Sequence, residues 1–282
     1  MGIDLAGLKL KNPVMVASGT FGFGIEFADL VDLNKLGAIV TKTVTLNKRE
    51  GNPQPRLIEV ENGLVNSIGL QNEGVEYFIK NYLPFLRKLD TAVIVNIAGE
   101  TVEEYARVTG ILAKEKGIDA IEVNISCPNV QKGCMVFGKD PNLTKDVISA
   151  VVHARREAHL PIIAKLSPNV DDITMIARAA LEAGADILSM INTVQTTVEV
   201  PVTKKTLTAG LSGPAIKETA LKLIAQVRKE VKAPIIGMGG IMNALDAREF
   251  FEAGADAIAV GTASFVDPRT AIKIIEGLRD PE

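Results

Sequence analysis

The chain has 282 residues, of which 47% are hydrophobic and 23% charged, which is the composition of an ordinary globular protein. A net charge of -3 argues against a nucleic-acid partner, and the lack of Trp with only three Tyr argues against a base-stacking surface. Two cysteines are too few for a disulfide scaffold, so we expect a reducing, cytoplasmic location. We expect no signal peptide and no membrane association, because no apolar run approaches the length of a membrane span.

Eight short apolar runs, rich in β-branched residues, alternate with longer amphipathic stretches along the chain. Runs of this length and composition are typical of strands that are buried on both faces. We expect strands at 13–19, 38–43, 92–99, 120–127, 161–167, 187–193, 234–240 and 257–263.

Most of the stretches between the strands show helical periodicity. Segment 101–117 places Val102, Tyr105 and Val108 near one face, and segments 171–185 and 243–255 have a similar form. Repeated strand-then-helix units imply parallel strands covered by helices. Eight such units predict an α/β fold, a (β/α)8 TIM barrel that forms one domain over residues 1–282, with an open doubly wound sheet as the structural alternative.

Two connections are too long to be simple turns. Residues 44–72 are rich in Asn, Gly and Pro, and residues 194–212 are polar with short β-like patches. Long loops in compact domains are usually functional. Both are expected as inserted loops at the C-terminal face of the barrel strands, where barrel enzymes place their chemistry.

Polar side chains recur where the predicted strands end. Any one of them could simply bond a neighbouring backbone group, but five in the same structural place indicate a mouth lined with donors and positive charge. Such a mouth suits a flat, polar, electron-accepting ring and an anionic ligand. The five residues are Lys42, Asn96, Asn124, Lys165 and Asn192.

Glycines follow the last two predicted strands, in "GMGGI" (237–241) and "VGTAS" (260–264). Loops at these two places in barrels often hold a phosphate with backbone N–H groups, and "SGPA" (212–215) could add further donors. We therefore expect a phosphorylated cofactor or substrate on this side.

Both cysteines lie in "NISCPNVQKGC" (124–134). A zinc site needs about four ligands, so no metal is expected here. An inert buried thiol is the commonest state of a cysteine, and Cys134 fits it. Cys127 closes a strand with polar ends, and no histidine lies at a strand end, so Cys127 is the best-placed candidate base for moving a proton.

These motifs together resemble a known family. The chain carries, in this order, "NPVMVASGTFGFG", "TKT", "GNPQPR", "NSIGLQN", "NISCPNV", "KLSPNV", "MINT", "LSGPAI", "PIIGMGGI" and "AVGTASF". The set resembles the catalytic subunit of class 1 dihydroorotate dehydrogenases over nearly the whole chain. The opening motif is more similar to class 1B, the NAD-linked form.

The resemblance implies FMN as cofactor and oxidation of dihydroorotate to orotate in pyrimidine biosynthesis, with Cys127 as the base that takes the C5 proton while a hydride leaves C6. It implies substrate contacts from Lys42, Asn66, Gly69, Leu70, Asn124, Asn192 and Thr193, with Asn129 beside them. It implies FMN contacts from Ala17, Ser18, Gly19, Lys42, Thr43, Asn96, Asn124, Lys165, Ile191, Gly213, Gly239, Gly240, Gly261 and Thr262.

The resemblance also implies a partner. Class 1B catalytic subunits form a homodimer core within a heterotetramer, whose second subunit carries FAD and a 2Fe-2S cluster and passes electrons to NAD. A cluster needs about four thiolates and this chain has two cysteines, so the cluster is expected only on the partner. The chain also carries no G-x-G-x-x-G strand–helix motif for a dinucleotide, and the resemblance places the FAD on the partner as well.

Two other functions remain open from the residues. A dihydropyrimidine dehydrogenase-like flavoenzyme would use a related cysteine on a substrate without a carboxylate. A Schiff-base phosphosugar aldolase would use a barrel lysine such as Lys165 with the same phosphate site.

Overall fold

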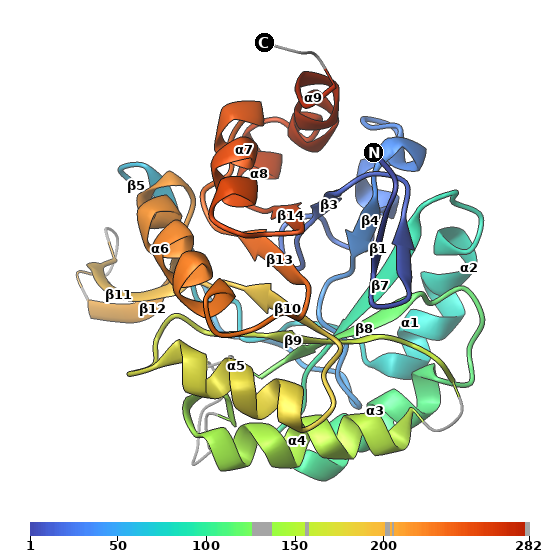
Figure 1. Ribbon diagram of the computed structural model, residues 1–282. Helices are drawn as coiled ribbons and strands as arrows, with labels where there is room; N and C mark the ends of the chain where they lie inside the picture. The colour runs from blue at the N-terminus through green and yellow to red at the C-terminus, as the bar shows by residue number, and fades with distance from the viewer. Residues whose placement is uncertain (126–136, 156–157, 201–203, 205, 280–282) are drawn as a thin grey trace.

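The structure is a computed structural model that describes residues 1–125, 137–155, 158–200, 204 and 206–279 (Figure 1). Eight parallel strands form a closed barrel, in which each strand pairs with the barrel strand before it in the chain and the last pairs with the first. The predicted (β/α)8 barrel is therefore confirmed, and the open-sheet alternative is wrong. The barrel strands are β3 (Val14–Val16), β4 (Ala38–Val40), β7 (Ala92–Ile97), β8 (Ala120–Asn124), β9 (Ile162–Lys165), β10 (Ile187–Met190), β13 (Ile235–Met238) and β14 (Ala257–Val260).

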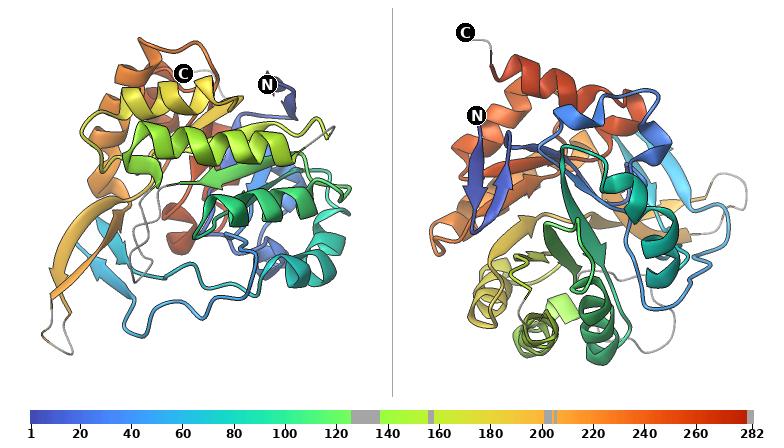
Figure 2. Two further views of the ribbon diagram at one scale, coloured as in Figure 1. Left: turned by 90° about the horizontal axis from the view of Figure 1, so that it is seen from below. Right: turned by 90° about the vertical axis from the view of Figure 1, so that its right-hand side faces the viewer.

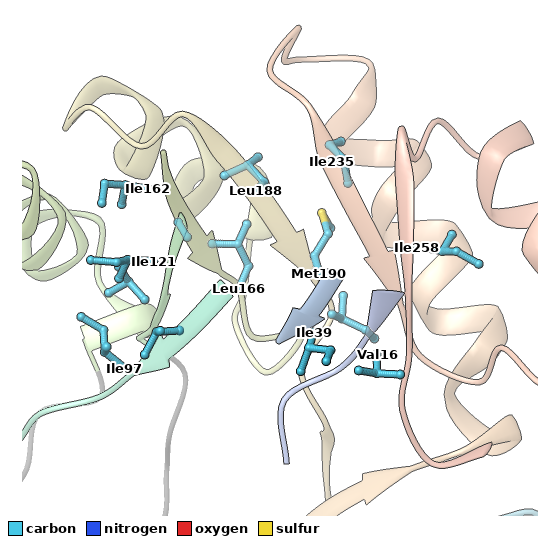
Figure 3. Close-up of a cluster of buried hydrophobic side chains, with 14 of the residues drawn as sticks. Val16, Ile39, Ile97, Ile121, Ile162, Leu166, Leu188, Met190, Ile235 and Ile258 are labelled. Carbon is cyan, nitrogen blue, oxygen red and sulfur yellow. The ribbon is translucent and has the colours of Figure 1, made fainter. Parts of the chain in front are cut away.

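Helices surround the barrel, and their apolar faces pack on the outward side chains of the strands, including Ile121, Ile162 and Leu188 (Figures 1 and 3). The predicted helix starts are confirmed by side-chain caps, since Thr101, Asp172 and Asn243 each accept a backbone N–H of the first turn. No helix of the described residues is long and apolar enough to cross a membrane. The helices are α1 (Val75–Asn81), α2 (Leu83–Leu86), α3 (Val102–Leu112), α4 (Pro141–Ala154), α5 (Ile173–Glu182), α6 (Lys217–Arg228), α7 (Ala244–Glu252), α8 (Ala263–Val266) and α9 (Thr270–Gly277).

A hairpin of β1 (Ile3–Leu5) and β2 (Leu8–Leu10) closes the N-terminal end of the barrel. Its leucines are buried in one apolar cluster with the inward side chains at the starts of the barrel strands. The cluster includes Leu5, Leu8, Leu10, Met15, Ala38, Ile94, Ala120, Ile163, Ile187, Ile236 and Ala257. This end of the barrel is therefore packed and dry, and any site must lie at the opposite end.

The two long connections do follow the C-terminal ends of barrel strands, as expected, and they pair with each other. Strands β5 (Leu57–Val60) and β6 (Gly63–Asn66) come from the first connection, and β11 (Val194–Glu199) and β12 (Thr206–Ser212) from the second. They form one antiparallel sheet in the order β11-β12-β6-β5, which we call the insertion sheet. It projects from the barrel in Figure 2, left.

Candidate active site

A pocket opens at the C-terminal end of the barrel, between the strand ends and the insertion sheet. Strands β6 and β12 contribute Leu64, Asn66 and Ser212 to its wall, and the segment after β6 contributes Ile68 to Gln71. An adjoining pocket continues toward the loops after β13 and β14 and shares Ser18, Lys165 and Asn192 with the first. The two pockets form one site, polar at one side and glycine-rich at the other.

The site gathers most of the residues that the sequence singled out. The first pocket is lined by Ser18, Gly19, Lys42, Thr43, Asn66, Gly69, Leu70, Asn124, Lys165, Asn192 and Thr193. The second is lined by Ala17, Ser18, Lys165, Ile191, Asn192, Thr193, Gly213, Gly239, Gly240, Gly261 and Thr262. Asn96 lines neither pocket and is fully buried in the barrel interior. Cys127 and Asn129 lie outside the described residues.

Hydrogen bonds hold the two amide residues of the first pocket, Asn124 and Asn192, in place. The Asn192 Nδ2 donates to Asn124 Oδ1 at 3.5 Å, and the Asn192 Oδ1 accepts the Thr193 N–H at 2.8 Å. Behind them, the Tyr105 hydroxyl donates to the Asn124 main-chain carbonyl at 2.7 Å, and Asn169 Nδ2 donates to the Thr193 carbonyl at 2.9 Å. Amides fixed in this way can recognise a ring that carries both donors and acceptors, because their orientation is set before the ligand binds.

Lys42 brings a positive charge to the pocket wall. Burial lowers the pKa of Lys42 from the usual 10.5, the nearby Arg56 guanidinium lowers it further, and the Glu26 carboxylate opposes both effects. Arg56 is itself held by Gln71, whose Oε1 accepts from the guanidinium at 2.5 Å. An ammonium that is partly desolvated and repelled by a second cation gains most from an anionic ligand, so this wall is suited to a carboxylate.

Lys165 lies at the floor of both pockets and contacts two side chains. Its Nζ donates to Ser18 Oγ at 2.8 Å and lies 3.5 Å from Oε1 of Glu122, a carboxylate inside the barrel. Glu122 is not among the residues predicted from the sequence. Its only signal there is an acidic residue between the apolar Ile121 and Val123 of a strand.

The backbone of the glycine-rich side fits a phosphorylated cofactor. Gly240 has a φ of 86°, and a Cβ there would lie 2.8 Å from Lys217 Cβ and 3.0 Å from the Gly213 carbonyl oxygen. Gly213 has a φ of 93°, and its Cβ would lie 3.0 Å from Gly63 Cα. Only glycine allows these backbones to approach so closely, which leaves main-chain groups available to an anion.

Asn96 offers a buried acceptor that could bind the ring of a cofactor. The Asn96 Oδ1 is buried and, within the described part of the chain, has no hydrogen-bond partner, although its Nδ2 donates to Glu122 at 2.6 Å. Buried acceptors without donors are rare in folded proteins, so this atom fits a donor that a ligand would bring. Together with the glycine loops and Lys165, the residues present fit FMN. Among the described residues no group of His, Cys, Asp and Glu is arranged to hold a metal ion.

Several pocket residues could not be found from the sequence. They belong to β5, β6, the segment after β6 and α8, and they include Leu57, Leu64, Gln71 and Phe265. Their place in the site depends on the pairing of two segments that are distant in the chain, for example Gly210 with Asn66. No local pattern in the sequence signals that pairing.

Comparison with known proteins gives one consistent answer. Residues 2–281 match the family model described as Dihydroorotate dehydrogenase. Proteins named "Dihydroorotate dehydrogenase B (NAD(+)), catalytic subunit" match almost end to end. That of Caldicellulosiruptor bescii is 52% identical and covers 98% of this chain and 92% of its own. Those of Geotalea uraniireducens and Desulforamulus reducens are 50% and 53% identical, each covering 99% of this chain and 92% of its own. The resemblance found from the sequence motifs is therefore confirmed, and the chain belongs to the dihydroorotate dehydrogenase family, in its class 1B branch.

Proposed function

We propose that this chain is the catalytic subunit of an NAD-linked dihydroorotate dehydrogenase of de novo pyrimidine biosynthesis, acting in the cytoplasm. It oxidises (S)-dihydroorotate to orotate, and residues 1–282 act as one FMN-binding barrel domain. The observation that carries the proposal is the single site that joins a lysine and amide pocket to a glycine-rich pocket. Relatives at 50–53% identity are named as catalytic subunits of NAD-linked dihydroorotate dehydrogenase, which supports the same reaction.

In this proposal the amide pocket binds the pyrimidine ring. Lys42 pairs with the substrate carboxylate, and the Asn124 and Asn192 amides bond the polar edges of the ring. A substrate without a carboxylate would leave Lys42 without its anion, which disfavours a uracil-type substrate. The proposed substrate contacts are Lys42, Asn66, Gly69, Leu70, Asn124, Asn129, Asn192 and Thr193.

The glycine-rich pocket and the barrel floor hold the cofactor. Bound FMN supplies the acceptor for the two electrons that leave C6 of the substrate. Lys165 would bring positive charge to the N1–O2 edge of the flavin ring, and Asn96 Oδ1 would accept a ring N–H. The proposed FMN contacts are Ala17, Ser18, Gly19, Lys42, Thr43, Asn96, Asn124, Lys165, Ile191, Gly213, Gly239, Gly240, Gly261 and Thr262.

Cys127 takes the proton from C5. It follows β8 by three residues, and that strand ends at Asn124 in the pocket wall. The C5–H bond leaves its electron pair to the forming double bond while the proton moves to the thiolate, so the chain needs no metal for this step.

The electrons then pass to a partner subunit. The matched relatives are named as catalytic subunits of an NAD-linked enzyme, which implies a second chain. We propose that this chain forms a homodimer and, with a partner carrying FAD and 2Fe-2S, a heterotetramer.

An anaerobic spectrum tests the proposal directly. The protein purified alone should be yellow, and dihydroorotate should bleach its flavin absorbance, whereas dihydrouracil should not. Cys127→Ser should bleach at least about 100-fold more slowly at neutral pH, since a positioned base contributes roughly 10²–10⁴-fold. A yellow protein that responds only to dihydrouracil would contradict dihydroorotate as the substrate. A colourless protein that does not bind added FMN would contradict the whole proposal.

A further inference from the structure

Glu122 is a carboxylate in the middle of β8, with apolar residues on both sides in the sequence. It lies in β8 between Ile121 and Val123, and its side chain is 1% exposed. Interior positions of the opposite barrel strands are filled by apolar residues such as Met15, Met238 and Ala259. A buried carboxylate is costly unless it is paired and hydrogen-bonded, so the position calls for a reason.

Both carboxylate oxygens of Glu122 have partners on other barrel strands. Asn96 of β7 donates its Nδ2 to Oε1 at 2.6 Å, and Ser189 of β10 donates its Oγ to Oε2 at 2.7 Å. Lys165 of β9 places its Nζ 3.5 Å from Oε1. An amide nitrogen and an ammonium can only donate, so Oε1 acts as an acceptor and Glu122 is built into a fixed polar network.

This network ends at the site. The Lys165 side chain is 6% exposed. Its Nζ also donates a hydrogen bond to Ser18 Oγ, at 2.8 Å. Lys165 and Ser18 both line the two pockets, whereas Glu122 lines neither. Lys165 therefore lies between a buried negative charge and the ligand, and Glu122, which lines neither pocket, is a positioning rather than a contact residue.

We propose that Glu122 is a positioning residue that fixes Lys165 against the flavin and offsets its positive charge, thereby setting the reduction potential of the bound FMN. The inference rests on the proposed function, because it takes FMN as the cofactor. Reduction places negative charge on the flavin ring, which a nearby ammonium stabilises and a carboxylate behind it counteracts. With Glu122 in place, Lys165 orients the ring without making the flavin too strong an oxidant.

Glu122→Gln separates charge from shape. The glutamine Oε1 can still accept from Asn96, and its Nε2 can donate to the Ser189 hydroxyl, so the network can be retained while the negative charge is lost. We expect the two-electron midpoint potential of FMN in this variant to rise by about 30 mV, which is a tenfold change in equilibrium. Sulfite, whose addition to oxidised flavin also leaves negative charge on the ring, should bind about tenfold more tightly.

Two control variants separate this role from a purely structural one. Glu122→Asp keeps the charge and should change the potential by less than about 10 mV, a twofold effect. Ser189→Ala removes one hydrogen bond to the same carboxylate without changing its charge, and should behave like Glu122→Asp. If the role of Glu122 were only structural, all three variants would lose stability. The midpoint potential of FMN would then be the same in all three as in the parent protein.

The measurement is a dye-coupled anaerobic titration of the FMN-loaded protein, with sulfite binding followed by the loss of flavin absorbance. A Glu122→Gln protein that binds FMN but keeps the parental potential and sulfite affinity, or shows a lower potential, overturns the inference while leaving the proposed function intact. If Glu122→Gln does not fold, Glu122→Asp carries the test, and a shift of about 30 mV or more in it overturns the inference. A parent protein that takes up no flavin overturns both.

Discussion

The Tyr105 hydroxyl donates a 2.7 Å hydrogen bond to the main-chain carbonyl oxygen of Asn124, and so ties helix α3 to the end of strand β8. Tyr105 is almost fully buried, and its ring packs edge-on against Phe137. A helix on the outside of the barrel thus fixes a residue that lines the pocket.

Tyr105→Phe keeps the ring and removes the hydroxyl that donates to Asn124. We expect it to lower the free energy of unfolding by about 1 kcal/mol, the usual net worth of a buried hydrogen bond, and to raise KM for dihydroorotate several-fold because Asn124 loses a support. Urea unfolding and steady-state kinetics measure the two effects. Tyr77→Phe, at an exposed tyrosine, should change neither. Parental values in Tyr105→Phe would show that Asn124 is held by other contacts.

Lys42 makes substrate binding depend on pH. Its pKa is lowered from 10.5 by burial first and by Arg56 second, so it loses its proton at a lower pH than a free lysine does. Carboxylate binding needs the ammonium form. KM should therefore be constant below the lowered pKa and rise as the pH increases through it, in a range below 10.5.

Arg56→Gln tests the second cause. Removing the guanidinium charge should raise the pKa of Lys42 and move the alkaline rise in KM to higher pH. Lys48→Gln is the matched control, because Lys48 is exposed and pairs with Glu50 and Glu73 instead. An alkaline limb that stays in place in Arg56→Gln would show that Lys42 does not govern it.

Gly240→Ala should weaken cofactor binding. The left-handed backbone disfavours alanine by roughly 1–2 kcal/mol, and the new Cβ would collide with Lys217 and the Gly213 carbonyl. We expect FMN affinity to fall by at least about tenfold, measured as flavin released per chain and by fluorescence titration. Gly110→Ala in α3 is the control, since its Cβ would meet only the Ala154 carbonyl, at 3.8 Å. That substitution should stabilise the protein by about 0.5–1 kcal/mol. If Gly240→Ala kept full flavin occupancy, the FMN phosphate would not bind at the Gly240 loop.

Leu8→Ala should destabilise the barrel without altering the site. Leu8 is 1% exposed in the cluster that closes the N-terminal end, and such a truncation costs roughly 2–5 kcal/mol. The neighbouring Lys9 is exposed, so Lys9→Ala should change the free energy of unfolding by less than about 0.5 kcal/mol. Folded Leu8→Ala protein should retain the parental flavin spectrum. Equal unfolding midpoints for the two variants would mean that the hairpin contributes little to stability.

The eight barrel strands could be predicted because each is an apolar, β-branched run, and because most of them are followed by a stretch with helical periodicity. Their ends could not. The prediction 187–193 becomes β10 at Ile187–Met190, and 13–19 becomes β3 at Val14–Val16. The residues past each end, such as Ser18 and Asn192, leave the strand ladder to line the pocket.

The site was predictable where its residues end or directly follow a barrel strand, as Asn124, Lys165 and Lys42 do. It was not predictable where it depends on pairing over long sequence separations, as in the β6 and β12 register of Asn66 with Gly210. The network of Glu122 with Asn96 and Ser189 also depends on three strands meeting in space. Apolar periodicity records burial but not which buried polar groups become partners.

The hairpin of residues 3–10 has a consequence for synthesis on the ribosome. It emerges before every barrel strand, yet the cluster that buries its leucines includes Ala257 of β14, the strand that completes the ring. At ~5–20 residues per second, that surface is translated only some tens of seconds later. During that interval Leu5, Leu8 and Leu10 have no completed barrel to cover them, so the nascent chain presents an apolar segment that chaperones are suited to hold.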